Sequence, residues 1–255
     1  PEPSPPLTIL IMVAKNSPMI RLSVILFLLG LNISLSAQKN AADYLKSGRE
    51  KHARGQISAA IADYNKALLL DKNNTEGYYY RGNAQFDQKN YRAAVEDFTQ
   101  CLKLNPAYKD ALYNRGNAYY ELGKFEQALE DFTRLIRLDS LYYDAYFDRG
   151  NTFYKLNRFR EAIEDFTAGL AIAPDEDHAW YDRGNTWFQT GEFEKAIADY
   201  TRAIQLDPQN PDFYFNRAVA ELNAEMVNEA CADLKKAAEL GDKEAKTYQN
   251  EFCKF

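Results

Sequence analysis

The sequence predicts an all-α protein built as a solenoid, a stack of similar helical units. Three observations predict this fold class. The motif Arg-Gly-Asn returns every 34 residues, at Arg81, Arg115, Arg149 and Arg183. A column of glycines and a column of alanines recur at the same period. Short breaks recur between them. Self-similarity at a period of about 20 to 50 residues is typical of units that each bury an apolar face against a neighbour.

Frames set by the glycine of this motif divide the chain into six units. In the last unit Ala218 replaces the glycine. The predicted units span 41–74, 75–108, 109–142, 143–176, 177–210 and 211–244.

Each unit begins with a predicted helix that carries a large residue four positions before the glycine, as Tyr78 stands before Gly82. A second predicted helix carries an alanine and, four positions later, a large core residue, as in Ala94 and Phe98. Four residues are about one helical turn, so the two members of each pair face the same side. The small residues let the two helices approach closely.

A short break separates the two helices of every unit. Glycine or a polar pair marks it, at Gly55, Gly123, Gly191, Lys89-Asn90 and Asn157-Arg158. Three units end in a proline, which cannot continue a helix, at Pro106, Pro174 and Pro208. Each unit is therefore expected to be a helix, a turn and a helix.

These columns resemble the tetratricopeptide repeat over residues 41–244. The match is strongest in the fifth unit, which has Trp180, Gly184, Trp187, Ala196, Tyr200, Ala203 and Pro208 in place. Departures occur at Lys72, Leu135, Ser140, Gly169 and Ala218, and none removes a helix. The resemblance implies a right-handed superhelix whose first helices form a concave face that holds peptides or partner proteins.

Residues 242–255 are expected to form an amphipathic helix that caps the open end of the sixth unit. Cys231 and Cys253 then lie on neighbouring antiparallel helices, and in an exported protein such a pair can form a disulfide. Two buried free thiols are the alternative. Cys101 stands in a column of small residues, where a packed thiol is expected.

The first 37 residues have the layout of a signal peptide with an upstream segment. Arg21 precedes fourteen almost wholly apolar residues, 22–35, and Ser36-Ala37 follow. A membrane-spanning helix needs about twenty apolar residues, so this run is short for an anchor. We expect residues 1–37 to be removed and the protein to be periplasmic or extracellular and free of the membrane. An uncleaved membrane anchor is the alternative.

Charge and motif content argue against several function classes. The net charge is −6, and without residues 1–37 the chain is one unit more acidic, with no cluster of lysine or arginine to bind nucleic acid. The two histidines, His52 and His178, are far apart in the repeat array. No HExxH, GxSxG, GxGxxG, P-loop or paired CxxC pattern occurs. We therefore expect no enzyme activity, no metal site and no cofactor.

Two charged columns run through the units. Aspartates recur at Asp63, Asp97, Asp131, Asp165, Asp199 and Asp233, and arginines at Arg81, Arg115, Arg149, Arg183 and Arg217. The first unit has Ser47 in place of the arginine yet keeps Asp63. We interpret this as a ladder between units, in which Arg81 reaches back to Asp63 and Asp233 is left to Lys246 or water. Arginines that grip an anionic ligand are the alternative.

The column directly after the glycine is asparagine in four units, at Asn83, Asn117, Asn151 and Asn185. Asparagine is a poor residue in the middle of a helix, so its repetition suggests a contact. Aromatic residues stand four before and three after these positions, at Tyr79, Phe86, Tyr113, Tyr120, Phe147, Tyr154, Tyr181 and Phe188. The spacing places amides and rings on one stripe of the first helices, which by the resemblance faces the concave groove.

These features predict a non-enzymatic scaffold that holds an extended segment of a protein or peptide partner. Side-chain amides can donate to the partner's C=O groups and accept from its N–H groups, and the rings between them supply affinity. The same stripe could instead pack first helix against first helix. A glycan-binding groove and an assembly subunit that uses its convex face are further alternatives. Ligand identity and oligomeric state stay open.

Overall fold

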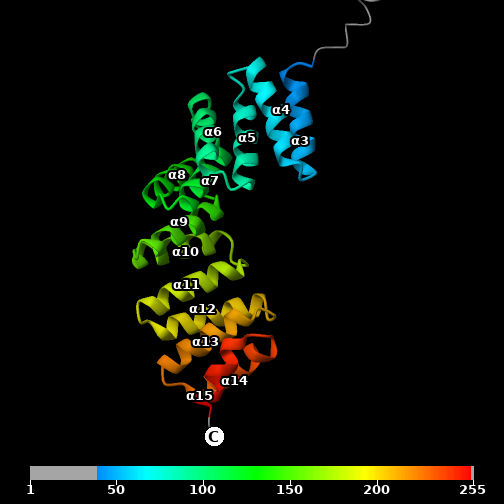
Figure 1. The fold of residues 1–255 in the computed structure, drawn as a ribbon. Coiled ribbons are helices and arrows are strands. Elements are labelled where there is room, and N and C mark those ends of the chain that lie inside the picture. Colours follow the sequence, from blue (N-terminus) through cyan, green and yellow to red (C-terminus); the bar gives the residue numbers. More distant parts are fainter. Residues whose placement is uncertain (1–38, 254–255) are drawn as a thin grey trace, which may run out of the picture.

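The structure is a computed structural model that describes residues 39–253. In that range the chain forms thirteen α-helices and no strand. Consecutive helices pair, and each pair packs on the next along the stack (Figure 1). The predicted all-α solenoid of six helix-turn-helix units with a C-terminal capping helix is confirmed. The predicted signal peptide, 1–37, lies outside the described residues.

The helices fall into three groups. The first helices of the units are α3 (Ala41–Ala53), α5 (Thr75–Asp87), α7 (Lys109–Glu121), α9 (Tyr143–Lys155), α11 (Asp177–Gln189) and α13 (Pro211–Asn223). The second helices are α4 (Ile57–Leu70), α6 (Tyr91–Leu104), α8 (Phe125–Leu138), α10 (Phe159–Ile172), α12 (Phe193–Leu206) and α14 (Val227–Glu239). The cap is α15 (Lys243–Phe252).

The first helices form the inner side of a right-handed solenoid. Each packs against its own second helix and against the second helix of the preceding unit, and it also touches the first helix of the next unit. Second helices of successive units are farther apart. The helix axes turn along the stack, from steep at α3 to nearly level at α11 in the view of Figure 1. Side chains on the first helices of neighbouring units can therefore share a ligand.

The turn between the two helices has the same conformation in every unit. A residue with positive φ follows the first helix each time, either a glycine, such as Gly55 at φ 73°, or Lys89, Asn157 and Glu225 at φ 60°, 57° and 62°. The backbone closes a Schellman motif around it, as when Gln56 N–H donates to the Lys51 carbonyl and Gly55 N–H to the His52 carbonyl. The left-handed turn is thus set by backbone hydrogen bonds even where glycine is absent.

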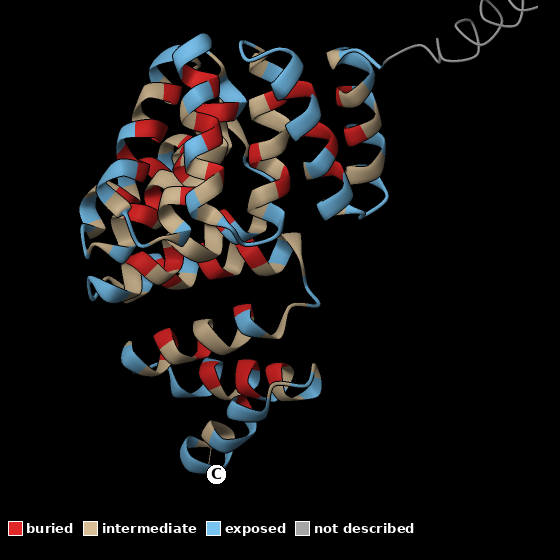
Figure 2. Cartoon of the chain, turned by 45° about the horizontal axis from the view of Figure 1, so that its top comes forward, coloured by how far each residue is buried: buried red, intermediate tan, exposed pale blue. Residues whose placement is uncertain are grey.

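In the first five units the core contains an aromatic ring packed directly on a glycine. A Cβ placed on Gly116 would lie 2.6 Å from Cε1 of Phe132, and the other glycines of this column meet their rings in the same way. In the sixth unit Ala218 replaces the glycine and Leu234 replaces the ring, and both are fully buried. Buried residues face one another between helices and exposed ones lie outward (Figure 2). The paired change keeps the packed volume.

The arginine column pairs within units, so the predicted ladder between units is wrong in its register. Arg115 Nε and Nη2 donate to the two oxygens of Asp131, at 2.7 Å each. The same fork joins Arg81 to Asp97, Arg149 to Asp165, Arg183 to Asp199 and Arg217 to Asp233. Asp233 therefore needs neither Lys246 nor water. Only the third donor, Nη1, reaches back to the preceding unit.

The first unit explains why the sequence suggested the wrong register. Asp63 accepts from the Ser47 hydroxyl at 2.6 Å and from the Lys51 ammonium at 2.5 Å. Lys51 stands one helical turn after Ser47 and so replaces the missing arginine from a different column. Between units, Arg115 Nη1 donates to Thr99 of the preceding second helix at 3.1 Å, and the matching acceptor for Arg81 is Asn65. The inter-unit contacts of the arginine column are therefore polar but not ionic.

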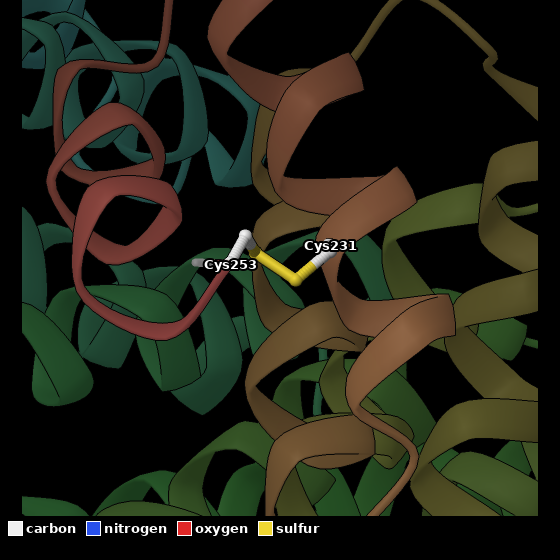
Figure 3. The surroundings of a disulfide bond; sticks show 2 residues. All are labelled: Cys231 and Cys253. Carbon is white, nitrogen blue, oxygen red and sulfur yellow. A yellow bond between two sulfur atoms is a disulfide. The ribbon is translucent and has the colours of Figure 1, made fainter. Parts of the chain in front are cut away.

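The cap helix is joined to the last unit by a disulfide between Cys231 and Cys253 (Figure 3). Their Cα atoms are 5.7 Å apart, and the bridge links α14 to the end of α15. Tyr248 and Ala245 of α15 pack with Ala237 and Leu234 of α14. Cys101 is a fully buried free thiol, whose pKa burial raises to about 12. The last unit is therefore covered on its open side.

Candidate functional site

The four asparagines lie half-buried on the inner side of the solenoid, between the first helices. They do not form a free row of amides, because each contacts a polar group nearby. Asn83 Oδ1 accepts from the Asn114 amide of the next unit at 2.8 Å. Asn185 Oδ1 accepts from the buried Tyr200 hydroxyl at 2.8 Å. An amide has two donors and two lone pairs, so these bonds leave hydrogen-bonding capacity toward the inner surface.

The aromatic residues of the stripe divide into two sets. Those four before the asparagine pack on neighbouring rings or helices, as the Tyr181 ring does on Phe213 of the next unit, with centroids 5.0 Å apart. Those three after it pair with the first residue of the second helix, as Tyr120 does with Phe125 at 5.4 Å. All eight are half-buried. Both sets therefore contribute to packing, and the second set also reaches the inner surface.

Three hollows on the inner side are lined mainly by first-helix side chains. The N-terminal hollow, about 920 Å³, lies beside α3 and α5 and includes Asn83. The middle hollow, about 360 Å³, is lined by His52, Asn83, Phe86, Asp87, Asn114 and Asn117. The distal hollow, about 270 Å³, is lined by Tyr120, Asn151, Tyr154, Lys155, Asp182 and Asn185.

The hollows bring together only part of the predicted stripe. All four asparagines line a hollow, together with Phe86, Tyr120 and Tyr154. The remaining predicted residues, Tyr79, Tyr113, Phe147, Tyr181 and Phe188, line none of these three. Phe147 instead packs where a side chain on Gly169 would stand, since a Cβ there would lie 2.3 Å from its ring. This contact explains why Gly169 replaces the second alanine of the family pattern.

Sequence reasoning missed a polar column that faces the asparagines. It stands directly before the arginine, at Asn114, Asp148, Asp182 and Asn216. Each of the first three lies 31 residues after an asparagine and contacts it across neighbouring first helices. Asn114 donates to Asn83, Asp148 makes a polar contact with Asn117, and Asp182 makes one with Asn151. Its 34-residue recurrence was a signal that could have revealed it.

Two of these side chains are half-buried carboxylates, Asp148 and Asp182. Burial raises the pKa of Asp182 to about 6, while Asn151 and His178 lower it and Asp148 raises it. Burial also raises the pKa of Asp148, against hydrogen bonds from Tyr113 and Asn117. The distal hollow thus holds a carboxyl group that changes charge in mildly acidic solution.

Within residues 39–253 no group of three or more His, Cys, Asp or Glu side chains is arranged to hold a metal ion. In the same part of the chain no helix has the length and apolar character needed to cross a membrane.

Family models for tetratricopeptide repeats match across the chain. One, described as Tetratricopeptide repeat, matches residues 79–143, 113–177 and 147–211, which together span more than half of the chain. Two others match residues 48–89 and 199–232. No catalytic family is among these matches. A search of curated proteins finds no match.

Several solved structures share the fold. MamA is 25% identical with a TM-score of 0.61, covering 65% of this chain and 96% of its own. YrrB, described as a TPR protein with an unusual peptide-binding site, is 19% identical with a TM-score of 0.64, covering 74% and 97%. PilF of Pseudomonas aeruginosa is 18% identical with a TM-score of 0.68, covering 83% and 97%. Together with the repeated columns and the helix pairs, these matches place the chain in the tetratricopeptide repeat family.

Proposed function

We propose that the protein is a non-enzymatic scaffold that holds an extended segment of a partner protein along the inner side of residues 75–210. The observation that carries this proposal is the succession of hollows on the first helices, each lined by one or more of the repeated asparagines. A site built once per unit suits a ligand that is itself periodic, and an extended polypeptide backbone is such a ligand. YrrB, a structural relative, is described as having a peptide-binding site, which supports the proposal.

The geometry sets the spacing of the contacts. Neighbouring helices pack about 8 to 10 Å apart and an extended peptide rises about 3.3 Å per residue, so one unit addresses about three ligand residues. Four amide bonds at about 0.5 to 1.5 kcal/mol each give about 2 to 6 kcal/mol. Micromolar binding requires about 8.2 kcal/mol. The rings of Phe86, Tyr120 and Tyr154, which line the hollows, must supply the difference.

The test selects peptide ligands on the purified chain from a library of unstructured twelve-residue peptides and measures their affinity for designed variants. The variant Asn117→Ala/Asn151→Ala removes two amides from different hollows. We expect at least about tenfold weaker binding, because the hydrogen bonds from these amides to the peptide are lost and the peptide groups that made them remain desolvated without a partner. Circular dichroism checks that helicity is retained.

The matched control is Gln100→Ala/Gln127→Ala, which changes two exposed amides on the second helices α6 and α8. Its affinity should equal that of the wild type. Undiminished binding by the asparagine variant would refute the proposal. Loss of binding by the glutamine variant alone would point instead to the convex side. A glycan array on the same protein tests the sugar-binding alternative.

We also propose that the protein is exported. The disulfide between Cys231 and Cys253 supports this, because disulfides persist mainly in oxidising compartments. N-terminal sequencing of the protein recovered from the periplasm or culture medium should begin after residue 37. Recovery of the uncleaved chain from membranes would contradict export with cleavage.

A further inference from the structure

The N-terminal hollow differs from the others in containing a buried hydroxyl group without an acceptor. Tyr64 of α4 lines this hollow and is fully buried. No described residue forms a hydrogen bond with its hydroxyl. A buried polar group without a partner costs free energy, so such groups are rare unless a ligand or another function uses them.

A comparison between units shows what is missing. Tyr200 stands at the same position of the fifth unit, and its hydroxyl donates to Asn185 at 2.8 Å. The counterpart of Asn185 in the first unit is Arg49, whose guanidinium has only donors. In the second to fourth units phenylalanine occupies the position, so no hydroxyl is present. The first unit alone combines the hydroxyl with a cation in place of its acceptor.

Two cations that line the hollow, Arg49 and Lys46, are available to pair with an anion. Arg49 lies over the Tyr80 ring, 4.8 Å from its centroid, and its charge lowers the pKa of Tyr64, which burial raises to about 12. No carboxylate of residues 39–253 forms an ion pair with Arg49 or Lys46. Two acidic residues also line the hollow, Glu50 and Asp87, and Asp87 is paired with His52 at 2.6 Å.

We propose that the N-terminal hollow binds the carboxylate of an acidic side chain, which accepts from the Tyr64 hydroxyl and pairs with Arg49 and Lys46. Insofar as that side chain belongs to the extended partner segment, the inference rests on the proposed function. Arg49 is exposed, so its long side chain has room to move with the ligand and admit an oxygen to the hydroxyl. Ala53, Ile57 and the Tyr80 ring form apolar walls that suit the methylene groups of glutamate.

A side-chain carboxylate suits the hollow better than the carboxylate of a chain terminus. The hydroxyl is inaccessible to solvent, so the ligand group must enter on a slender apolar stem. A terminal carboxylate is attached directly to a Cα and a polar amide, whose burial without partners is costly.

The test titrates the purified chain with N-acetyl-glutamate amide and follows the Arg49 Nε–Hε resonance by nuclear magnetic resonance. N-acetyl-glutamine amide is the neutral probe of the same shape, N-acetylglycine carries a terminal carboxylate, and inorganic phosphate is a different anion. We expect the glutamate probe to bind at least about tenfold more tightly than the glutamine probe, since hydrogen bonds to charged groups are the stronger ones. Tighter binding of N-acetylglycine or phosphate would overturn the assignment to an acidic side chain.

Three variants identify the groups involved. Tyr64→Phe removes only the hydroxyl and installs the residue found in the second to fourth units, so the fold accepts it. We expect about tenfold or greater loss of affinity for the glutamate probe, with an unchanged or raised melting temperature. Arg49→Asn installs the residue of the second to fifth units and should abolish binding, which is measured by isothermal titration calorimetry because this variant lacks the Arg49 resonance. Tyr200→Phe, the matched control, should bind as the wild type does.

Equal affinity of Tyr64→Phe and the wild type for the glutamate probe would overturn the proposal. The affinity for the glutamate probe can be measured whether or not the proposed function is correct. Binding of the probe by Asn117→Ala/Asn151→Ala should stay at the wild-type level, even though that variant loses the selected peptides. If the peptides bind the asparagine variant normally while the probe still needs Tyr64, the groove proposal fails and the acidic site stands.

Discussion

Each arginine of the repeated column uses its donors on two units at once. Two donors of Arg149 fork onto Asp165 of its own unit at 2.7 Å, and the third reaches Thr133 of the preceding unit at 3.0 Å. The carboxylates are buried, and the arginines are mostly buried. The column therefore orients the two helices of a unit by ion pairs and aligns neighbouring units by hydrogen bonds to neutral acceptors.

Arg149→Ala should lower the free energy of unfolding by about 3 to 5 kcal/mol, because it leaves the buried Asp165 carboxylate without its partner. Urea denaturation followed by circular dichroism measures the change. Arg160→Ala, which removes an arginine side chain that is 90% exposed, is the control and should have little effect. A double-mutant cycle should show coupling of Arg149 with Asp165 but not with Asp131. The opposite pattern would restore the ladder between units.

Asp182 makes stability depend on pH in mildly acidic solution. Its pKa rises from 3.8 to about 6 on folding, so the folded state binds the proton more tightly than the unfolded state. Stability therefore falls as the pH rises through the window between about 4 and 6. Asp182→Asn should remove this decline and be more stable than the wild type at pH 7 by about 1 to 2 kcal/mol, with little difference at pH 3.5. Melting curves of both proteins at the two pH values check it; equal stability at pH 7 would contradict it.

Within one unit, the size of the glycine-column residue and the size of the core ring are matched. Gly116 faces the Phe132 ring, whereas Ala218 faces Leu234 in the sixth unit. The first pair seats a large side chain directly on the helix backbone, and the second keeps a methyl group and a smaller side chain. Either pair fills the space between the two helices.

Gly116→Ala should destabilise the protein by about 1 kcal/mol or more, because the overpacking of Phe132 outweighs the better helix propensity of alanine. In the background Phe132→Leu, which copies the sixth unit, the same substitution should cost less. Chemical denaturation of the two single variants and the double variant measures this coupling. Purely additive effects would show that the two sizes are not matched.

Much of this element-level structure could be predicted from the sequence, because helices, breaks and core residues recur at a fixed period. The turns at Lys89 and Asn157 could be predicted although no glycine stands there. These two residues lie 34 positions after Gly55 and Gly123, which mark the turns of the preceding units. The inner surface was harder. Its contacts join residues 31 positions apart on different units. Such cross-unit contacts depend on how units pack, which no single unit encodes.

At the scale of the whole molecule, the stack is stabilised by contacts between neighbours alone, so damage at one end should stay local. The C-terminal end depends on the disulfide that holds α15 over α14. The N-terminal end has no equivalent staple among the described residues, and there the N-terminal hollow opens beside α3.

Cys231→Ser/Cys253→Ser should lower the stability of the C-terminal end by about 3 kcal/mol, the value expected for opening a loop of this size, which here spans 22 residues. Hydrogen exchange should accelerate in α14 and α15 and stay unchanged in α3 to α6. Before these measurements, mass spectrometry of the wild-type protein without reductant should detect the disulfide between Cys231 and Cys253. Two free thiols there would contradict it.

The central claim is that the first helices, rather than the second helices or the ends, hold an extended partner segment. Hydrogen–deuterium exchange of the purified chain, with and without a selected peptide at saturation, tests it most directly. We expect protection of α5, α7, α9 and α11 in steps of one unit along the stack. Protection confined to α6, α8, α10 and α12, or to α15, would contradict it.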